Sequence, residues 1–243
     1  MGADPPPDEL KPAGTGRCPP TSWVGTTPGG GSPSVSDRDP LPILTEVTGW
    51  LWSFLVESHP RLGRKGDVCP FMAQSLRLGR TAVSTVDISG PSGPRHLEIL
   101  ARSALARLGD DCTGDELYNS FVMVPIGSPS AVRQDVVRAV QRVLKPEAVA
   151  AGKMIGDFFP GNPMAAIHNP LFRPMASPHP LLAVRAMVVT DILFLGSPAV
   201  PARDRLSSLR VWHNRFGATA APAWAALYHQ VRDTAEEEAH AQP

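Results

Sequence analysis

Proline most limits how this chain folds, because its ring fixes one backbone dihedral and removes a hydrogen-bond donor. The 243 residues include 27 prolines, and six of them lie between residues 160 and 180, in the stretch PGNPMAAIHNPLFRPMASPHP. Neither a regular helix nor a central strand tolerates that density. We therefore predict a long, stiff loop. Loops of this length often line a site, but a rigid coat over the sheet, with Leu171, Phe172 and Met175 filling gaps in the core, is equally consistent.

Proline and glycine also mark a boundary near the start of the chain. They supply 17 of the first 42 residues, in a stretch with few large apolar side chains to offset the entropy of ordering. We predict a disordered tail over residues 1–40, a single folded domain over 41–231, and an acidic, frayed tail over 232–243.

The hydrophobic periodicity of the domain predicts an α+β fold. Segments rich in β-branched and aromatic residues alternate with segments that carry one apolar face at helical spacing. We predict a single domain with a roughly four-stranded, mostly antiparallel sheet and helices packed on it. The predicted strands are 81–88, 119–126, 153–159 and 182–189, and the predicted helices start at Leu41, Pro70, Leu97, Pro129, Ala202 and Trp224.

Composition excludes several kinds of protein. Lys+Arg and Asp+Glu number 23 each, so no overall basic field favours nucleic acid. No apolar run approaches the ~20 residues that a membrane helix needs. The three cysteines form no disulfide framework, and no secretory signal precedes them. We therefore expect a cytoplasmic protein that binds neither nucleic acid nor membrane, and the sequence does not indicate its oligomeric state.

Arg185 interrupts an otherwise apolar strand just beyond the proline-rich segment. Alternation along the strand points its guanidinium into partly buried surroundings, where it needs an anion. That anion could be a substrate carboxylate or a cofactor propionate. It could equally be an aspartate of the chain itself, at 87, 157 or 191.

The segment GRKGDVCPF at 63–71 is a second candidate. Glycines flanking Arg64 and Lys65 allow the backbone to wrap an anionic group, although a plain turn has the same sequence. Cys69 precedes a predicted helix start and could be a reactive thiolate or a metal ligand, or an inert buried thiol.

Other site chemistries find less support. No two histidines stand four residues apart as in a helical zinc site, and no GxSxG motif is present. His168 and His179 lie within the proline-rich segment.

Longer motifs point to a family. HPRLGRKGDVCPF at 59–71, GKMIGDFFPGNP at 152–163, HNPLFRPMASPHPLLAVRAMVVTDILFL at 168–195 and Phe216-Gly217 resemble a family of unknown function found mainly in actinobacteria, DUF6875. Its members often stand beside genes for specialised metabolism. The layout is also similar to that of the small haem-dependent N-oxygenases of the YqcI/YcgG type.

These resemblances imply a biosynthetic enzyme acting on a small amine or amino-acid-like substrate, such as an oxidoreductase with haem as cofactor. His168 or Cys69 would then be the haem ligand. Arg185, Arg173 and Arg64 would hold carboxylates, and Phe158 and Phe172 would wall an apolar pocket. The alternative is a non-catalytic module of a biosynthetic pathway that binds a small molecule or a protein partner.

Overall fold

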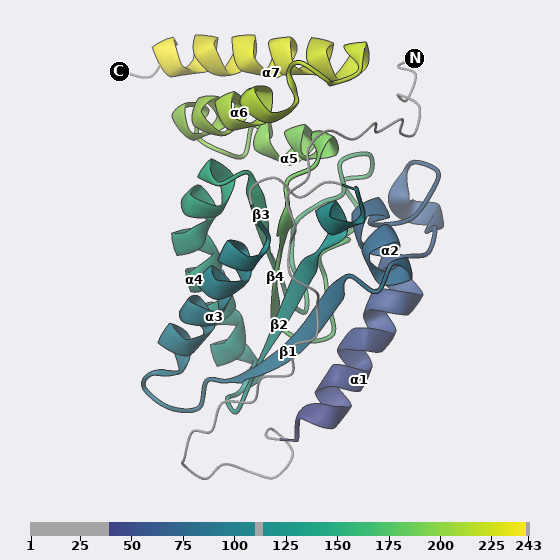
Figure 1. The fold of residues 1–243 in the computed structure, drawn as a ribbon, viewed down its shortest axis with the longest axis vertical. Coiled ribbons are helices and arrows are strands. Elements are labelled where there is room, and N and C mark those ends of the chain that lie inside the picture. Colours follow the sequence, from purple (N-terminus) through teal and green to yellow (C-terminus); the bar gives the residue numbers. More distant parts are fainter. Residues whose placement is uncertain (1–38, 110–113, 242–243) are drawn as a thin grey trace.

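A four-stranded sheet lies between two layers of helices in the computed structural model, which describes residues 39–109 and 114–241 (Figure 1). The strands are β1 (Thr81–Asp87), β2 (Ser120–Ile126), β3 (Lys153–Phe158) and β4 (Leu181–Ala186), in the spatial order β1-β2-β4-β3. The predicted tail at 1–40 lies outside the described residues except for its last two, and Pro40 already begins the first helix.

The sheet is mixed. β1 and β2 run parallel, with Thr81 opposite Ser120, and α3 (Gly93–Arg107) connects them as in the predicted β-α-β unit. β4 pairs antiparallel with β2 and with β3. The α+β domain with a mostly antiparallel sheet is thus confirmed, and its parallel pair is the one whose strands a helix connects.

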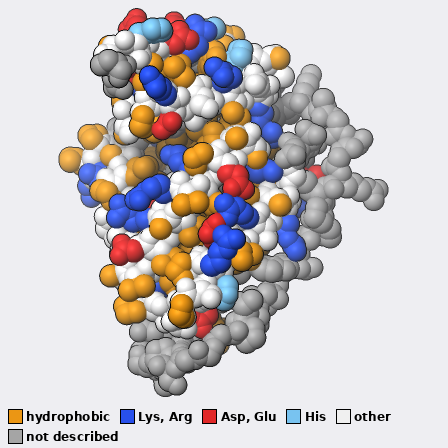
Figure 2. Space-filling model, turned by 90° about the vertical axis from the view of Figure 1, so that its left-hand side faces the viewer, with side chains coloured by type: hydrophobic (Ala, Val, Ile, Leu, Met, Phe, Trp, Pro, Cys, Tyr) orange, Lys and Arg blue, Asp and Glu red, His pale blue; other side chains and the backbone are white. Residues whose placement is uncertain are grey.

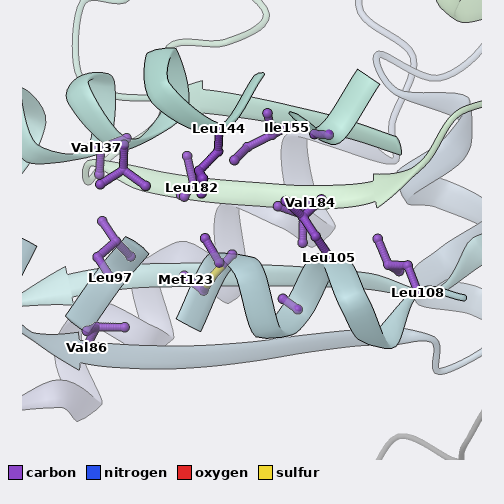
Figure 3. Close-up of a cluster of buried hydrophobic side chains, with 14 of the residues drawn as sticks. Val86, Leu97, Leu105, Leu108, Met123, Val137, Leu144, Ile155, Leu182 and Val184 are labelled. Atoms are coloured by element: carbon purple, nitrogen blue, oxygen red, sulfur yellow. The ribbon is translucent and has the colours of Figure 1, made fainter. Parts of the chain in front are cut away.

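One face of the sheet is covered by α3 and α4 (Ser130–Ala150), which supply the largest apolar cluster. Figure 3 shows Leu97 and Leu105 of α3 and Leu144 of α4 meeting Met123 of β2 and Leu182 of β4. α4 begins at Ser130, one residue after the predicted start at Pro129, and Pro129 is its N-cap residue. The hydroxyl of Ser128 donates to the carbonyl of Ile88.

The opposite face is covered by α1 (Pro40–Trp50), a π-helical turn (Leu51–Leu55) that continues it, and α2 (Pro70–Arg77). Buried side chains at every fourth position turn toward β2 and β4. They are Ile43, Val47, Leu51 and Leu55.

A third layer covers one end of the sheet (Figure 1). It consists of α5 (Ile192–Leu195), α6 (Ala202–Phe216) and α7 (Pro222–Ala241), packed around the fully buried Trp212, whose indole N–H donates to the carbonyl of Val189. Two predictions fail here. β4 ends at Ala186 because a 3-10 turn follows at Val189–Asp191, and residues 232–241 are helical rather than frayed, with the buried Ala235 among them.

The free edge of β3, one of the two outer strands of the sheet, is partly bonded to side chains of the same chain. On β3, the side chain of Gln141 donates to the carbonyl of Ile155, and that of Asn162 donates to the carbonyl of Asp157. The carboxylate of Asp157 also accepts from its own backbone N–H. The outward polar groups of β3 are therefore already partly bonded within the chain.

The surface is mixed in character. Figure 2 shows the side of the molecule that carries α3 and α4, with Lys and Arg interspersed among acidic and apolar side chains. In the part of the chain that the structure describes, no helix combines the length and apolarity of a membrane span.

Candidate functional site

The loop after the π-helical turn is shaped by glycines and by His59. The Nδ1 atom of His59 accepts from the backbone N–H of Arg61 and so begins a short 3-10 turn, Pro60–Leu62. Gly63 follows with a φ of +80°, and a Cβ there would lie 2.6 Å from the carbonyl oxygen of His168. Glycine is required for both reasons, and it brings this loop against the proline-rich segment.

Arg64 holds the same loop closed. Its guanidinium donates to the backbone carbonyls of Lys65 and Asp67 at 2.9 and 2.8 Å, and to that of Val68 at 3.3 Å. The predicted anion-wrapping loop is thus organised around its own arginine. The side-chain ammonium group of the exposed Lys65 has no hydrogen-bond partner within the described residues.

Residues 160–180 form the predicted long loop, here called the proline loop, without a helix or strand. Arg61 donates to the carbonyl of Leu171 at 2.8 Å, and Asn169 donates to the carbonyl of Arg61 at 2.7 Å. Further along, Nε2 of His179 lies 2.8 Å from a carboxylate oxygen of Glu46 on α1. The loop is therefore held by polar contacts in its middle and near its C-terminal end.

An aromatic cluster lies beneath the proline loop. Phe172 stacks on His59 with ring centroids 4.5 Å apart and lies 5.9 Å from Phe54. Trp50 lies 5.9 Å from both Phe54 and Phe158. The structure thus brings Phe158 and Phe172, the predicted walls of an apolar pocket, into one cluster, where they contact other aromatic rings and belong to the core of this face.

Arg173 follows Phe172 and donates to the carbonyls of Pro170 and Phe172. Arg61, Arg64 and Arg173 all bond to backbone carbonyls, and none of them, nor Lys65, has an ion-pair partner among the described residues. We call the meeting of the Gly63 loop and the proline loop, with these four side chains, the cationic junction.

Arg185 lies elsewhere, at the end of β4. Its Nη1 and Nη2 atoms donate to the two carboxylate oxygens of Asp191 at 2.7 and 2.6 Å, and its guanidinium lies 4.7 Å from the ring centroid of Phe71. Burial lowers the pKa of Arg185, but the charge and hydrogen bonds of Asp191 outweigh it and raise that pKa overall. Of the alternatives left open by the sequence, the structure shows the internal ion pair.

Cys69 is the N-cap residue of α2 and contacts the apolar core of that face. Burial raises the pKa of its thiol, although the Arg185 charge and the backbone N–H groups of Met72 and Phe71 act in the opposite direction. The side chain is therefore a thiol at neutral pH.

The two predicted haem ligands do not share a site. A haem thiolate requires a lowered pKa, whereas that of Cys69 is raised. His168 is exposed on the proline loop, and its ring has no hydrogen-bond partner within the described residues. Among those residues no three His, Cys, Asp or Glu side chains gather as metal ligands. Haem binding stays a prediction, and the raised pKa of Cys69 does not favour that residue as the ligand.

Sequence reasoning missed Arg61 and the ring of His59. Both residues stand in the motif at 59–71, but the motif alone assigns neither of them a contact. The one usable signal was the glycine after Leu62, which marks a turn whose residues must meet another segment closely.

The geometry defines an α+β domain whose proline loop closes over an aromatic cluster beside four cations. Residues 44–226 match the family model described as "Domain of unknown function (DUF6875)", and the chain belongs to that family. No curated protein and no solved structure matches the chain.

Proposed function

We propose that this protein is a non-catalytic module of bacterial specialised metabolism that binds a small, carboxylate-bearing, amino-acid-like molecule at the cationic junction. The observation that supports it is a set of four cations, beside an aromatic cluster, that have no carboxylate partner among the residues that the structure describes. Each guanidinium has five N–H donors, and the carbonyls bonded to Arg61 and Arg173 use only part of them. The remaining donors suit a carboxylate, and the cluster suits an apolar side chain.

The state of the other reactive groups favours binding over catalysis. The Cys69 thiol is partly buried and its pKa is raised, so it is a poor nucleophile. One nitrogen of His59 accepts from Arg61, and His179 is held by Glu46. Both histidines thus hold the loops in place, which supports a binding role for the junction.

The binding test uses isothermal titration calorimetry with N-acetyl-L-phenylalanine and with its uncharged amide as the matched ligand. We expect the acid to bind at least tenfold more tightly than the amide. Lys65→Met and Arg173→Met should each weaken binding by about fivefold, the effect of losing one charge contact near the surface. Arg210→Met, an exposed change on α6, is the control.

Equal affinity for acid and amide, or equal loss in the Arg210→Met control, would refute recognition of the carboxylate. If the N-acetyl derivatives of leucine, tryptophan and glutamate also fail to bind, the junction is not a site for acylated amino acids.

An oxidising, haem-dependent enzyme is the second candidate, and the free ring of His168 is the observation that favours it. Added haemin should then give a Soret band that His168→Ala removes and that Cys69→Ala retains. A colourless, folded protein in the presence of haemin excludes this candidate.

A further inference from the structure

The outer edge of β1 carries unpaired backbone groups. Ser120 donates its N–H to the carbonyl of Arg80, and Ile88 donates its N–H to the carbonyl of Ile126, so the even-numbered residues of β1 bond to β2. Because these groups alternate along a strand, the N–H and C=O groups of Thr81, Val83, Thr85 and Asp87 point outward. Within residues 39–109 and 114–241, none of these outward groups has a hydrogen-bond partner.

An unpaired strand edge is a template for another strand. β3, at the other side of the sheet, has Gln141 and Asn162 bonded to its outward carbonyls. In the part of the chain that the structure describes, no side chain bonds to the outward groups of β1. β1 also lacks the lysine, proline and bulge that commonly protect an edge, and its sequence is TAVSTVD.

An apolar groove lies on the α1 flank that faces this edge. Glu46 and Trp50 point to the proline loop and β3, so the opposite flank of α1 lies on the side of β1, as Figure 1 shows. There, Leu41 and Trp52 are 68% and 47% exposed. The groove has no charged side chain and is lined by Leu41, Leu44, Thr45, Thr48, Gly49 and Trp52.

We infer that β1 and the α1 groove together are the interface of a homodimer, in which β1 pairs antiparallel with β1 of a second copy. A two-fold axis perpendicular to the sheet relates the copies, as in most dimers. Both α1 helices then lie on the same face, and their grooves face each other across the paired strands. A single two-fold rotation thus gives a partner both to the free edge of β1 and to the α1 groove.

Charge and register favour this occupant. Arg80 and Asp87 stand at opposite ends of β1, so antiparallel pairing brings the cationic end of one strand to the anionic end of the other, whereas parallel pairing would align like charges. The register centred on Ser84 aligns all seven residues. This register places Val83 opposite Thr85 of the second copy and Ser84 opposite Ser84 of the second copy.

The interface needs both parts. Stable dimers bury about 800 Å² on each partner, more than one strand of seven residues supplies. The exposed Leu41 and Trp52 provide the additional apolar area. The proposal is independent of the carboxylate site, which lies on the other flank of α1.

The register gives a direct test by cross-linking. Ser84 bonds inward to β2, so Ser84 and its copy form a non-hydrogen-bonded pair with Cα atoms about 4.5 Å apart, which suits a disulfide. Ser84→Cys in the full chain should form a covalent dimer under mild oxidant. Ala82→Cys is the matched control, because Ala82 and its copy would lie about 14 Å apart. Equal cross-linking of both variants, or none of Ser84→Cys, overturns the register and the proposal.

Sedimentation velocity of the unmodified chain tests the dimer itself. We expect a concentration-dependent dimer that Thr85→Pro weakens about 25-fold, because each of the two copies loses one donor worth about fivefold. Thr85→Val keeps the N–H and should dimerise normally. Thr85→Pro loses no hydrogen bond within the sheet, because the N–H of Thr85 points outward. If Thr85→Pro nevertheless fails to fold, Thr48→Glu replaces it as the test, because it brings two negative charges together in the facing grooves of the dimer.

A dimer that persists in folded Thr85→Pro and in Thr48→Glu overturns the proposal, as does a monomer at 100 µM. In a monomer, hydrogen exchange of the Val83 and Thr85 amides identifies the alternative. Protected amides mean that another segment of the same chain covers the edge, and unprotected amides mean that the edge is open to solvent.

Discussion

The Arg185–Asp191 pair should be one of the most costly interactions to break in this fold. Asp191 is fully buried, and its carboxylate accepts from both terminal nitrogens of Arg185 and from the backbone N–H of Val188 at 2.8 Å. Arg185→Met removes two charge-assisted hydrogen bonds and leaves a buried carboxylate with one donor. Each such bond contributes about 1.5–3 kcal/mol, and removing one partner of a buried pair costs about 3–5 kcal/mol.

The measurement is the free energy of unfolding from urea titration followed by circular dichroism. We expect Arg185→Met to lose about 3–5 kcal/mol. Adding Asp191→Asn should recover about 2 kcal/mol of that loss, because asparagine removes the stranded charge yet still accepts from Val188. Arg95→Met, at a 64% exposed side chain, is the control and should change stability by less than about 0.5 kcal/mol.

The reasoning is wrong if Arg185→Met costs no more than Arg95→Met. It is also wrong if the double variant is less stable than Arg185→Met alone, because the cost would then come from lost packing against Phe71.

Three further results are expected. Gly63→Ala should unfold more easily than Gly79→Ala and should expose the proline loop to limited proteolysis. Both glycines have a positive φ, but only at Gly63 would a Cβ contact His168. Equal effects of the two substitutions would mean that this contact does not stabilise the loop. Burial raises the pKa of Asp157 despite Arg138 and Lys145, so the folded state binds this proton more tightly than the unfolded state and loses stability as pH rises through the folded pKa. Asp157→Asn should therefore be more stable than the unmodified chain at pH 7, by less than about 1 kcal/mol because the group is partly exposed. Thermal melts below pH 3 should show no difference between the two proteins. An equal gain in stability at low pH would contradict a titration effect. Because burial raises the pKa of Cys69, iodoacetamide at pH 8 should modify its thiol at least tenfold more slowly in the folded than in the urea-unfolded chain. Peptide mass spectrometry measures the two rates. Equal rates would show that Cys69 is an accessible thiolate in the folded chain.

Most of the fold could be predicted from local patterns. The four strands begin within one residue of their predicted starts, and α6 has the predicted bounds, because apolar periodicity and flanking glycine or proline determine where such elements form. The end of β4 could not be predicted, because Met187 is as apolar as the strand residues but is buried in the end layer instead.

The site was harder to predict because it depends on contacts between distant segments. The sequence offered three aspartates for Arg185, and only the 3-10 turn at Val189–Asp191 brings one of them back beside the guanidinium. The stacking of His59 on Phe172 likewise depends on the path of the whole proline loop. The sequence does not distinguish a thiol from a thiolate, so the protonation state of Cys69 could be inferred only from the residues that surround it in the fold.

The unequal edges of the sheet also limit how far copies of the chain can assemble. A strand joined to β1 leaves a sheet that ends in β3 on both sides, where Gln141 and Asn162 occupy the outward carbonyls. Growth would therefore stop at two copies, and a protein with one exposed strand edge would stay protected from forming fibrils.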